Sequence, residues 1–229
     1  MEQAARRSPH SVELEILPMG LHDLGVEMRS HVQTRIVAAD GDSYDAILLG
    51  YGLCGRGTDG LRAGRAPLVI PRAHDCITLL MGDWKRTAAY FADHPSVYYR
   101  SPGWVEFQTG QTLQPANTAN RLGERRTREE FIAQYGEENG EYLYAQFNAY
   151  RRRYSGLTYI STGVASDSIC REKARDEAAK HGWSFEEVKG SVALLQRLMN
   201  GDWNAADFLV VPPGASVRGV LGDAILEAV

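Results

Sequence analysis

Three cysteines, Cys54, Cys76 and Cys170, are the residues of this chain whose type and position point most directly to chemistry. Each lies in the segment that follows a short apolar run of the kind that forms a buried strand. Inert core thiols would be expected within such strands or on helix faces. An odd number of cysteines also suits a disulfide framework poorly. The pattern predicts that the three sulfur atoms meet at one site.

Cys54 lies in a glycine-rich segment, Gly50 to Gly57 (GYGLCGRG), directly after an apolar run. Closely spaced glycines let a backbone turn sharply and approach a ligand closely. Glycine loops at the start of helices also bind phosphate, so phosphate binding is an alternative at this segment.

Cys76 ends the segment Pro71 to Cys76 (PRAHDC), which follows a second apolar run. Asp75 is a suitable N-cap, and it places Cys76 in the first turn of the next helix, where aligned N–H groups favour a thiolate. His74 can reach the same point from the loop, either as a metal ligand or as a residue that supports one. Cys170 would fall in the first turn of a later helix if Ser166 or Asp167 caps it.

Thiolates select zinc, copper(I) or iron–sulfur clusters, so the cysteines predict a metal centre. Three cysteines with His74 would complete a tetrahedral zinc site, and three cysteines alone could hold a four-iron cluster with one open iron. Zinc and an iron–sulfur cluster therefore both remain open. A metal-free enzyme is an alternative, with Cys54 or Cys76 as the nucleophile and His74 as the base. Buried structural thiols are a further alternative.

Polar residues beside the cysteines could bind a substrate. Arg56, Arg72 and Arg100 could each hold a carboxylate or phosphate, because a planar guanidinium binds such groups through two parallel hydrogen bonds. Tyr51 could donate a hydrogen bond into the site. Each of these side chains could also be an ordinary surface or packing residue.

Short apolar runs alternate with helical patterns along the chain. Four runs predict buried strands, at residues 44–50, 68–71, 157–160 and 208–211, and the alternation at 12–16 predicts an edge strand. Strands that alternate with helices favour a parallel sheet, in which ligands bind beyond the carboxyl ends of the strands. We expect an α/β fold with a mostly parallel central sheet of four to five strands flanked by helices, and the cysteine segments at one rim.

Helical spacing is clear at residues 24–39, where Met28, Val32 and Ile36 share one face, and again at 167–181. A short helix is expected at the C-terminus, after a Pro-Pro-Gly segment that would help to shape the rim.

The middle of the chain differs in composition. Residues 107–126 are polar and predict an exposed loop, and residues 127–154 predict a helix that opens with the capping box Thr127-Arg128-Glu129-Glu130 and is interrupted by a glycine pair. We expect a single α/β domain over residues 1–229, with a helical insertion at about residues 105–154.

The bulk composition excludes several classes of protein. The chain has 229 residues, a net charge of −4 and a pI near 5.9, so it has no basic excess that would attract nucleic acid. Its longest apolar runs are far too short to cross a bilayer. The N-terminal segment has no apolar stretch of signal-peptide length. We expect a cytoplasmic protein that binds neither nucleic acid nor membrane.

The two segments GYGLCGRG and PRAHDC resemble the domain of unknown function 1638, a bacterial and archaeal family. Further landmarks of that resemblance are Ser101 to Trp104, Thr162-Gly163, Gly201 to Trp203 and Val210 to Gly214. The resemblance spans roughly residues 12–214 and implies a single domain.

Members of that family are often encoded near corrinoid methyl-transfer proteins. The resemblance thus implies a role in one-carbon, corrinoid-linked methyl metabolism, as an enzyme acting on a small molecule or as an accessory protein. A non-catalytic partner of a corrinoid protein is the alternative. The spacing His74-x-Cys76 followed by Cys170 is also similar to the zinc pattern of cobalamin-independent methionine synthase, although that enzyme is a barrel longer than this chain.

Overall fold

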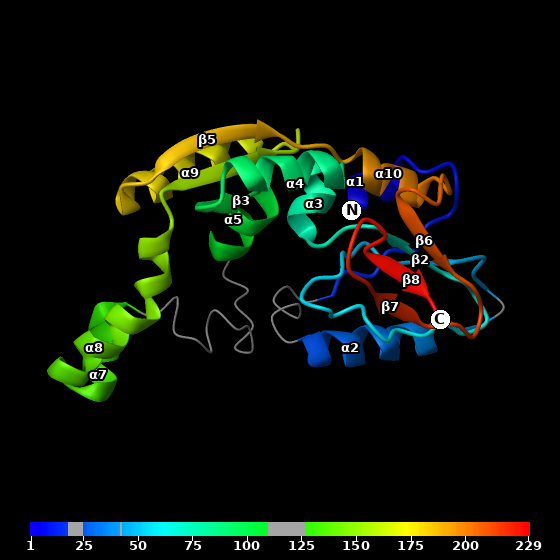
Figure 1. The fold of residues 1–229 in the computed structure, drawn as a ribbon, viewed down its shortest axis with the longest axis horizontal. Coiled ribbons are helices and arrows are strands. Elements are labelled where there is room, and N and C mark those ends of the chain that lie inside the picture. Colours follow the sequence, from blue (N-terminus) through cyan, green and yellow to red (C-terminus); the bar gives the residue numbers. More distant parts are fainter. Residues whose placement is uncertain (18–24, 42, 110–126) are drawn as a thin grey trace. The chain divides into compact units, whose positions relative to one another are not determined.

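A computed structural model describes residues 1–17, 25–41, 43–109 and 127–229 of the chain (Figure 1). The chain divides into two compact units. Unit 1 comprises Met1–Ala92 and Gly190–Val229, and unit 2 is the intervening segment Asp93–Lys189. The predicted single domain stays a prediction, because this division does not show whether either unit folds alone.

Unit 1 contains a three-stranded sheet in the order β1-β2-β6, built from β1 (Ile47–Leu48), β2 (Leu68–Pro71) and β6 (Phe208–Val211). Strands β1 and β2 are parallel, and β6 pairs antiparallel with β2, with Phe208 opposite Pro71 and Val211 opposite Leu68. The carboxyl ends of β1 and β2 therefore lie at the same edge. The Pro-Pro-Gly segment after β6 lies at the opposite edge, so its predicted place on the rim is wrong.

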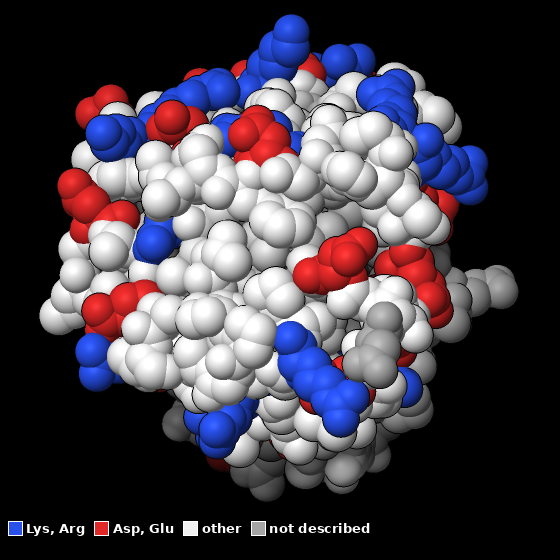
Figure 2. Space-filling model, turned by 90° about the vertical axis from the view of Figure 1, so that its right-hand side faces the viewer, with Lys and Arg blue, Asp and Glu red and all other residues white. Residues whose placement is uncertain are grey.

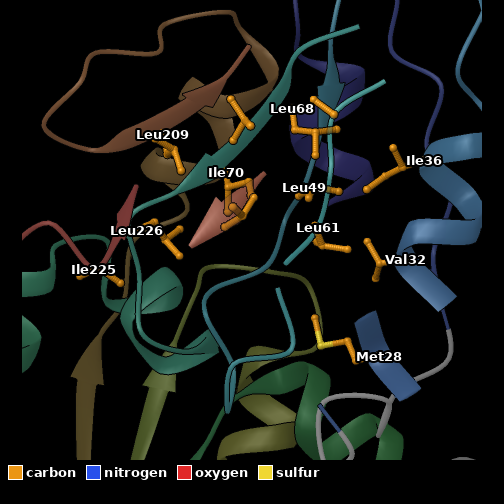
Figure 3. Close-up of a cluster of buried hydrophobic side chains, with 13 residues drawn as sticks. Met28, Val32, Ile36, Leu49, Leu61, Leu68, Ile70, Leu209, Ile225 and Leu226 are labelled. Carbon is orange, nitrogen blue, oxygen red and sulfur yellow. The ribbon is translucent and has the colours of Figure 1, made fainter. Parts of the chain in front are cut away.

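The main core of unit 1 lies between this sheet and helix α2 (Gly25–Ala38). The predicted face of α2 is confirmed: Met28, Val32 and Ile36 are buried and point toward Leu49, Leu61 and Leu68 (Figure 3). Burying one such side chain contributes about 1.5–3 kcal/mol.

The remaining helices of unit 1 are short. They are α1 (Glu2–Arg6), α3 (Cys76–Met81), α4 (Trp84–Asp93, whose last residue belongs to unit 2) and α10 (Ala193–Met199). Helix α10 contributes Leu194 and Leu198 to a second buried cluster, which also includes Phe208 of β6. None of the described helices is long and apolar enough to cross a membrane.

The C-terminus forms a hairpin of strands β7 (Val217–Gly219) and β8 (Leu226–Ala228), so the predicted C-terminal helix is wrong. Glycine disfavours helix, and Gly222 adopts a positive φ of 90° in the connection between the strands. Val217 and Leu226 are buried in the main core, and this burial fixes which face of the hairpin points inward.

Unit 2 contains a wholly parallel sheet in the order β3-β4-β5, with β3 (Val97–Arg100), β4 (Gly156–Ser161) and β5 (Ser184–Lys189). Helices α5 (Pro102–Thr109) and α9 (Asp167–His181) follow β3 and β4. Strand β4 and helix α9 match the sequence-based expectation. Strands β3 and β5 were not expected from the sequence. Strand β5 is largely exposed and polar (SFEEVK), so it lacks the apolar run that would predict a buried strand.

The chain between β3 and β4 also contains α7 (Arg128–Tyr135), α8 (Glu137–Phe147) and a 3₁₀ segment, η2 (Ala149–Arg153). The predicted capping box is confirmed, since Thr127 and Glu130 exchange their backbone and side-chain hydrogen bonds. Gly136 ends α7 with a φ of 80°, which interrupts the predicted helix. The loop predicted at 107–126 is helical up to Thr109, and its remainder lies outside the described residues.

The expected central sheet of four to five strands is wrong in its size. The described strands form two three-stranded sheets and a hairpin, and the overall class is mixed α/β. The run 157–160 belongs to the sheet of unit 2, whereas 47–48 and 68–71 belong to that of unit 1. Residues 12–16, predicted as an edge strand, are described without strand pairing.

Candidate metal centre

The two segments that carry Cys54 and Cys76 lie side by side in unit 1. The backbone N–H of Leu53 donates to the carbonyl of Ala73 at 2.8 Å, and that of Cys54 donates to the carbonyl of His74 at 2.8 Å. These bonds hold the two segments together beyond the ends of β1 and β2. The segments of Cys54 and Cys76 thus lie at one sheet edge, as predicted. The segment of Cys170 follows β4, which belongs to a different sheet, so the prediction of one shared sheet is wrong for this cysteine.

Gly52 makes this close approach possible. A Cβ atom at this position would lie 2.8 Å from both the Ala73 carbonyl oxygen and the Asp75 backbone nitrogen, closer than real Cβ contacts. Both neighbours are backbone atoms, which cannot rotate away as a side chain can. Glycine at position 52 is therefore a steric requirement of the paired segments.

The backbone at Cys54 is held in an uncommon conformation. Cys54, Gly55 and Arg56 have consecutive φ values of 45°, 61° and 68°. A left-handed conformation costs a residue with a side chain roughly 1–2 kcal/mol, and it persists only where the surroundings hold it. The amide of Gly57 donates to the Cys54 carbonyl at 3.0 Å and closes this turn.

The Cys54 side chain is half-buried and packs against the main core of unit 1. Burial is the largest cause that raises its pKa, to about 11, and the nearby charges of Cys76 and Asp75 raise it further. Hydrogen bonds from the backbone amides of Gly52 and Cys76 lower this pKa, but by less than burial and the charges raise it. At neutral pH the thiol of Cys54 is therefore protonated, in a place where backbone donors already face its sulfur.

Asp75 caps helix α3 as predicted. Its carboxylate accepts hydrogen bonds from the backbone N–H and the hydroxyl of Thr78, each at 2.8 Å. Cys76 is the first residue of α3 and is half-buried. His74 is exposed, two residues before Cys76.

Tyr51 is half-buried beside the same segment and packs against the main core. Burial raises the pKa of its hydroxyl, and the charges of Cys54 and Glu15 raise it further. The side chain thus stays a neutral phenol near the Cys54 sulfur.

Arg56 and Arg72, predicted to bind an anion, have different surroundings. Arg56 is exposed, and its Nε donates to Asp59 at 2.9 Å. The Arg72 guanidinium donates hydrogen bonds to three backbone carbonyls of unit 1. The acceptors are Ala205 at 2.9 Å, Ala224 at 2.6 Å, and Leu226. Anion binding by either arginine stays a prediction, and Arg56 is the more accessible of the two.

Asp59 was not foreseen as a residue that supports the site. Its carboxylate accepts hydrogen bonds from Arg56 and, at 2.8 Å, from the backbone N–H of Gly219 in β7. Burial alone would raise its pKa, but these donors outweigh burial and hold the pKa below its ordinary value. No local sequence signal marks this role, because Gly219 lies far along the chain.

Cys170 and Arg100 belong to unit 2, where both are buried. The Cys170 sulfur lies 3.8 Å from the carbonyl of Pro102 and packs with apolar residues of α9 and β4. Burial is the main cause that raises the pKa of this thiol. Arg100 forms a two-bond ion pair with Glu177, at 2.8 and 2.7 Å, and lies over the Tyr98 ring.

The structure thus brings together two of the predicted ligands, Cys54 and Cys76, with His74 adjacent in sequence. Within the described residues, no group of three or more His, Cys, Asp and Glu side chains is arranged to hold a metal ion. Whether Cys170 joins the other two cysteines stays a prediction.

A sequence comparison identifies the protein family of the chain. The sequence model of the family described as "Protein of unknown function (DUF1638)" matches residues 16–199. The chain belongs to the DUF1638 family. No curated protein and no solved structure matches the chain.

The DUF1638 match contains all three cysteines but ends before β6. Several partners of the site therefore lie beyond it, including the Ala205 and Ala224 carbonyls bound by Arg72 and the Gly219 amide bound by Asp59. The landmarks at 201–203 and 210–214 also lie beyond the matched range. In this DUF1638 protein, residues outside the matched segment thus hold Arg72 and Asp59 in place by hydrogen bonds.

The glycines at 50, 52 and 55 have the spacing G-x-G-x-x-G of dinucleotide-binding loops. That motif requires a helix directly after the loop, with the phosphate at its N-terminus. Here residues 54–60 form consecutive turns, and Gly52 approaches the Ala73–Asp75 backbone. The local structure therefore does not support the phosphate-binding alternative.

Substitution of Gly52 tests the close approach of the two segments. We expect Gly52→Ala to lower the free energy of unfolding by roughly 3 kcal/mol, because the new methyl group meets fixed backbone on two sides. Denaturant titration measures this change. Gly41→Ala is the matched control in unit 1, since nothing lies within 4 Å of its Cβ position. A cost at Gly52 no larger than that at Gly41 would contradict the observed packing.

The alkylation of Cys54 by iodoacetamide tests its electrostatic surroundings. The thiolate is the reactive form, so we expect alkylation of the metal-free protein to be slow at neutral pH and to rise toward a midpoint of about pH 11. Cys76→Ala removes a neighbouring charge and should lower that midpoint. Mass spectrometry of the peptide that contains Cys54 follows the reaction at this residue alone.

The raised pKa of Cys54 also determines how the stability of the folded protein changes with pH. The folded state holds the Cys54 proton more tightly than the unfolded chain, so this group destabilises the fold as the pH rises from about 9 to about 11. A Cys54 midpoint below 9 would mean that the folded protein stabilises its thiolate, contrary to the described surroundings.

Proposed function

We propose that unit 1 of this DUF1638 protein binds a thiophilic metal ion, with zinc the best match, through the thiolates of Cys54 and Cys76. The observation that carries the proposal is the placement of the Cys54 sulfur next to Cys76 by two fixed backbone segments. Soft sulfur ligands on a rigid edge of a sheet suit zinc, whose structural and catalytic sites use such donors.

The electrostatics of the pair favour a cation. Each thiolate opposes ionisation of the other, and this mutual effect contributes to the raised pKa of Cys54. The two nearby guanidinium groups are directed elsewhere, Arg56 to Asp59 and Arg72 to backbone carbonyls. A bound divalent ion would neutralise both thiolates at neutral pH, since metal binding releases the thiol protons.

His74 is the proposed third ligand, because its exposed side chain lies two residues before Cys76. The four-iron cluster predicted from the sequence requires three cysteines, so it would need Cys170 in addition to the two cysteines of unit 1. Zinc is therefore the simpler proposal. The three-cysteine centre predicted from the sequence is the alternative that the experiment below separates.

A zinc site with three protein ligands keeps a fourth position for water or substrate, where zinc can activate a bound thiol or water. We propose methyl transfer in one-carbon metabolism as the context, on the basis of the family resemblance. Arg56 would interact with an anionic group of the substrate or with a corrinoid partner, since its guanidinium is exposed near the same turn. Tyr51 would supply a neutral hydroxyl.

Metal titration of purified protein tests this proposal. After treatment with a chelator under reducing conditions, we expect zinc or cobalt(II) to bind at about one equivalent, and cobalt to give sulfur-to-metal charge-transfer absorption. Cys54→Ala and Cys76→Ala should each weaken binding by at least about tenfold. His74→Ala should weaken it less.

Cys170→Ala distinguishes the two forms of the centre. Unchanged affinity supports a site made by Cys54, Cys76 and His74, and a loss equal to that of Cys54→Ala supports the three-cysteine centre. Failure of zinc, cobalt and iron to bind the reduced protein would contradict both forms.

A further inference from the structure

Cys54 and Cys76 are the only two cysteines in the sequence of unit 1, and backbone hydrogen bonds join the segments that carry them. The Cys54 backbone donates to the His74 carbonyl at 2.8 Å, and the Cys54 sulfur accepts a hydrogen bond from the Cys76 amide. A sulfur bonded to the amide of a residue lies close to the Cβ of that same residue. The Cys54 sulfur thus lies next to Cys76.

This arrangement suits a covalent bond between the sulfurs. A disulfide requires Cα atoms about 4.4–6.8 Å apart and side chains directed toward one another. Gly52 keeps the segments in contact, and the capped start of α3 fixes the backbone at Cys76. The left-handed turn at Cys54 fixes the other partner.

We propose that Cys54 and Cys76 form a reversible disulfide, so that this edge of unit 1 is a thiol–disulfide site. The oxidant is a low-molecular-weight disulfide such as oxidised glutathione. This proposal does not rest on metal binding and holds for the metal-free protein. If zinc also binds there, oxidation removes both thiolate ligands, and the ion and the disulfide exclude each other.

The exchange proceeds in two balanced steps. The thiolate of one cysteine attacks the small disulfide, which forms a mixed disulfide and releases one small thiolate. The second cysteine, as its thiolate, then attacks the protein sulfur of that mixed disulfide, and a second small thiolate leaves. The two protein thiols lose two protons and two electrons, and one small disulfide becomes two small thiols.

The environment of Cys170 makes it the natural control. Its sulfur is buried among apolar residues of unit 2, at 3.8 Å from the Pro102 carbonyl. It should react slowly with a small disulfide in the folded protein. Cys170→Ala should leave the exchange between Cys54 and Cys76 unchanged.

Equilibration of chelator-treated protein in glutathione buffers of graded redox potential tests the proposal. We expect one transition in which the intact mass falls by two hydrogens, and a proteolytic digest without reductant should then contain a peptide pair that links Cys54 to Cys76. The linkage should form in the Cys170→Ala protein as well. Cys54→Ser and Cys76→Ser should each yield a glutathione adduct on the remaining thiol in place of the link.

Separate glutathione adducts on Cys54 and Cys76 in the wild-type protein, or a link that forms only in denaturant, would overturn the proposal. Circular dichroism checks that the serine variants are folded, and the wild-type digest decides the outcome if they are not. Zinc titration of the same reduced preparation is read independently, so a failure of metal binding is distinguishable from a failure of disulfide formation.

Discussion

Unit 1 depends on one constraint, the contact between the Gly52 backbone and the backbone of residues 73–75. This contact leaves no room for a Cβ atom, and hydrogen bonds from Leu53 and Cys54 hold it in place. It lies beyond the ends of the two short parallel strands β1 and β2. Two cysteines separated by more than twenty residues are brought together as a consequence.

The rest of unit 1 supports that contact from several sides. Helix α2 and the C-terminal hairpin both pack in the core of the sheet. Hydrogen bonds of Asp59 and Arg72 connect this hairpin to the segments that follow β1 and β2. On the face of the molecule in Figure 2, basic and acidic side chains are intermingled around a central area of uncharged residues. The charges that raise the pKa of Cys54 are those of its neighbours Cys76 and Asp75.

Local features were predictable from the sequence, and long-range partners were not. The buried face of α2, the Asp75 cap and the capping box at Thr127 depend on residues a few positions apart. The pairing of the Cys54 and Cys76 segments followed from consecutive parallel strands. Apolar runs of about four residues do not specify their partners, so the division into two sheets and the antiparallel direction of β6 could not be foreseen. The bonds of Arg72 to Ala224 and Leu226 have no local signal either.

We have proposed that the sulfur atoms of Cys54 and Cys76 share one metal ion. X-ray absorption at the zinc edge of the zinc-loaded protein tests it most directly, because sulfur and nitrogen or oxygen ligands differ in scattering and in bond length. We expect at least two sulfur ligands at about 2.3 Å, with one lost in Cys54→Ala and one lost in Cys76→Ala. A first shell of nitrogen and oxygen alone, or a sulfur count that neither substitution changes, would contradict it.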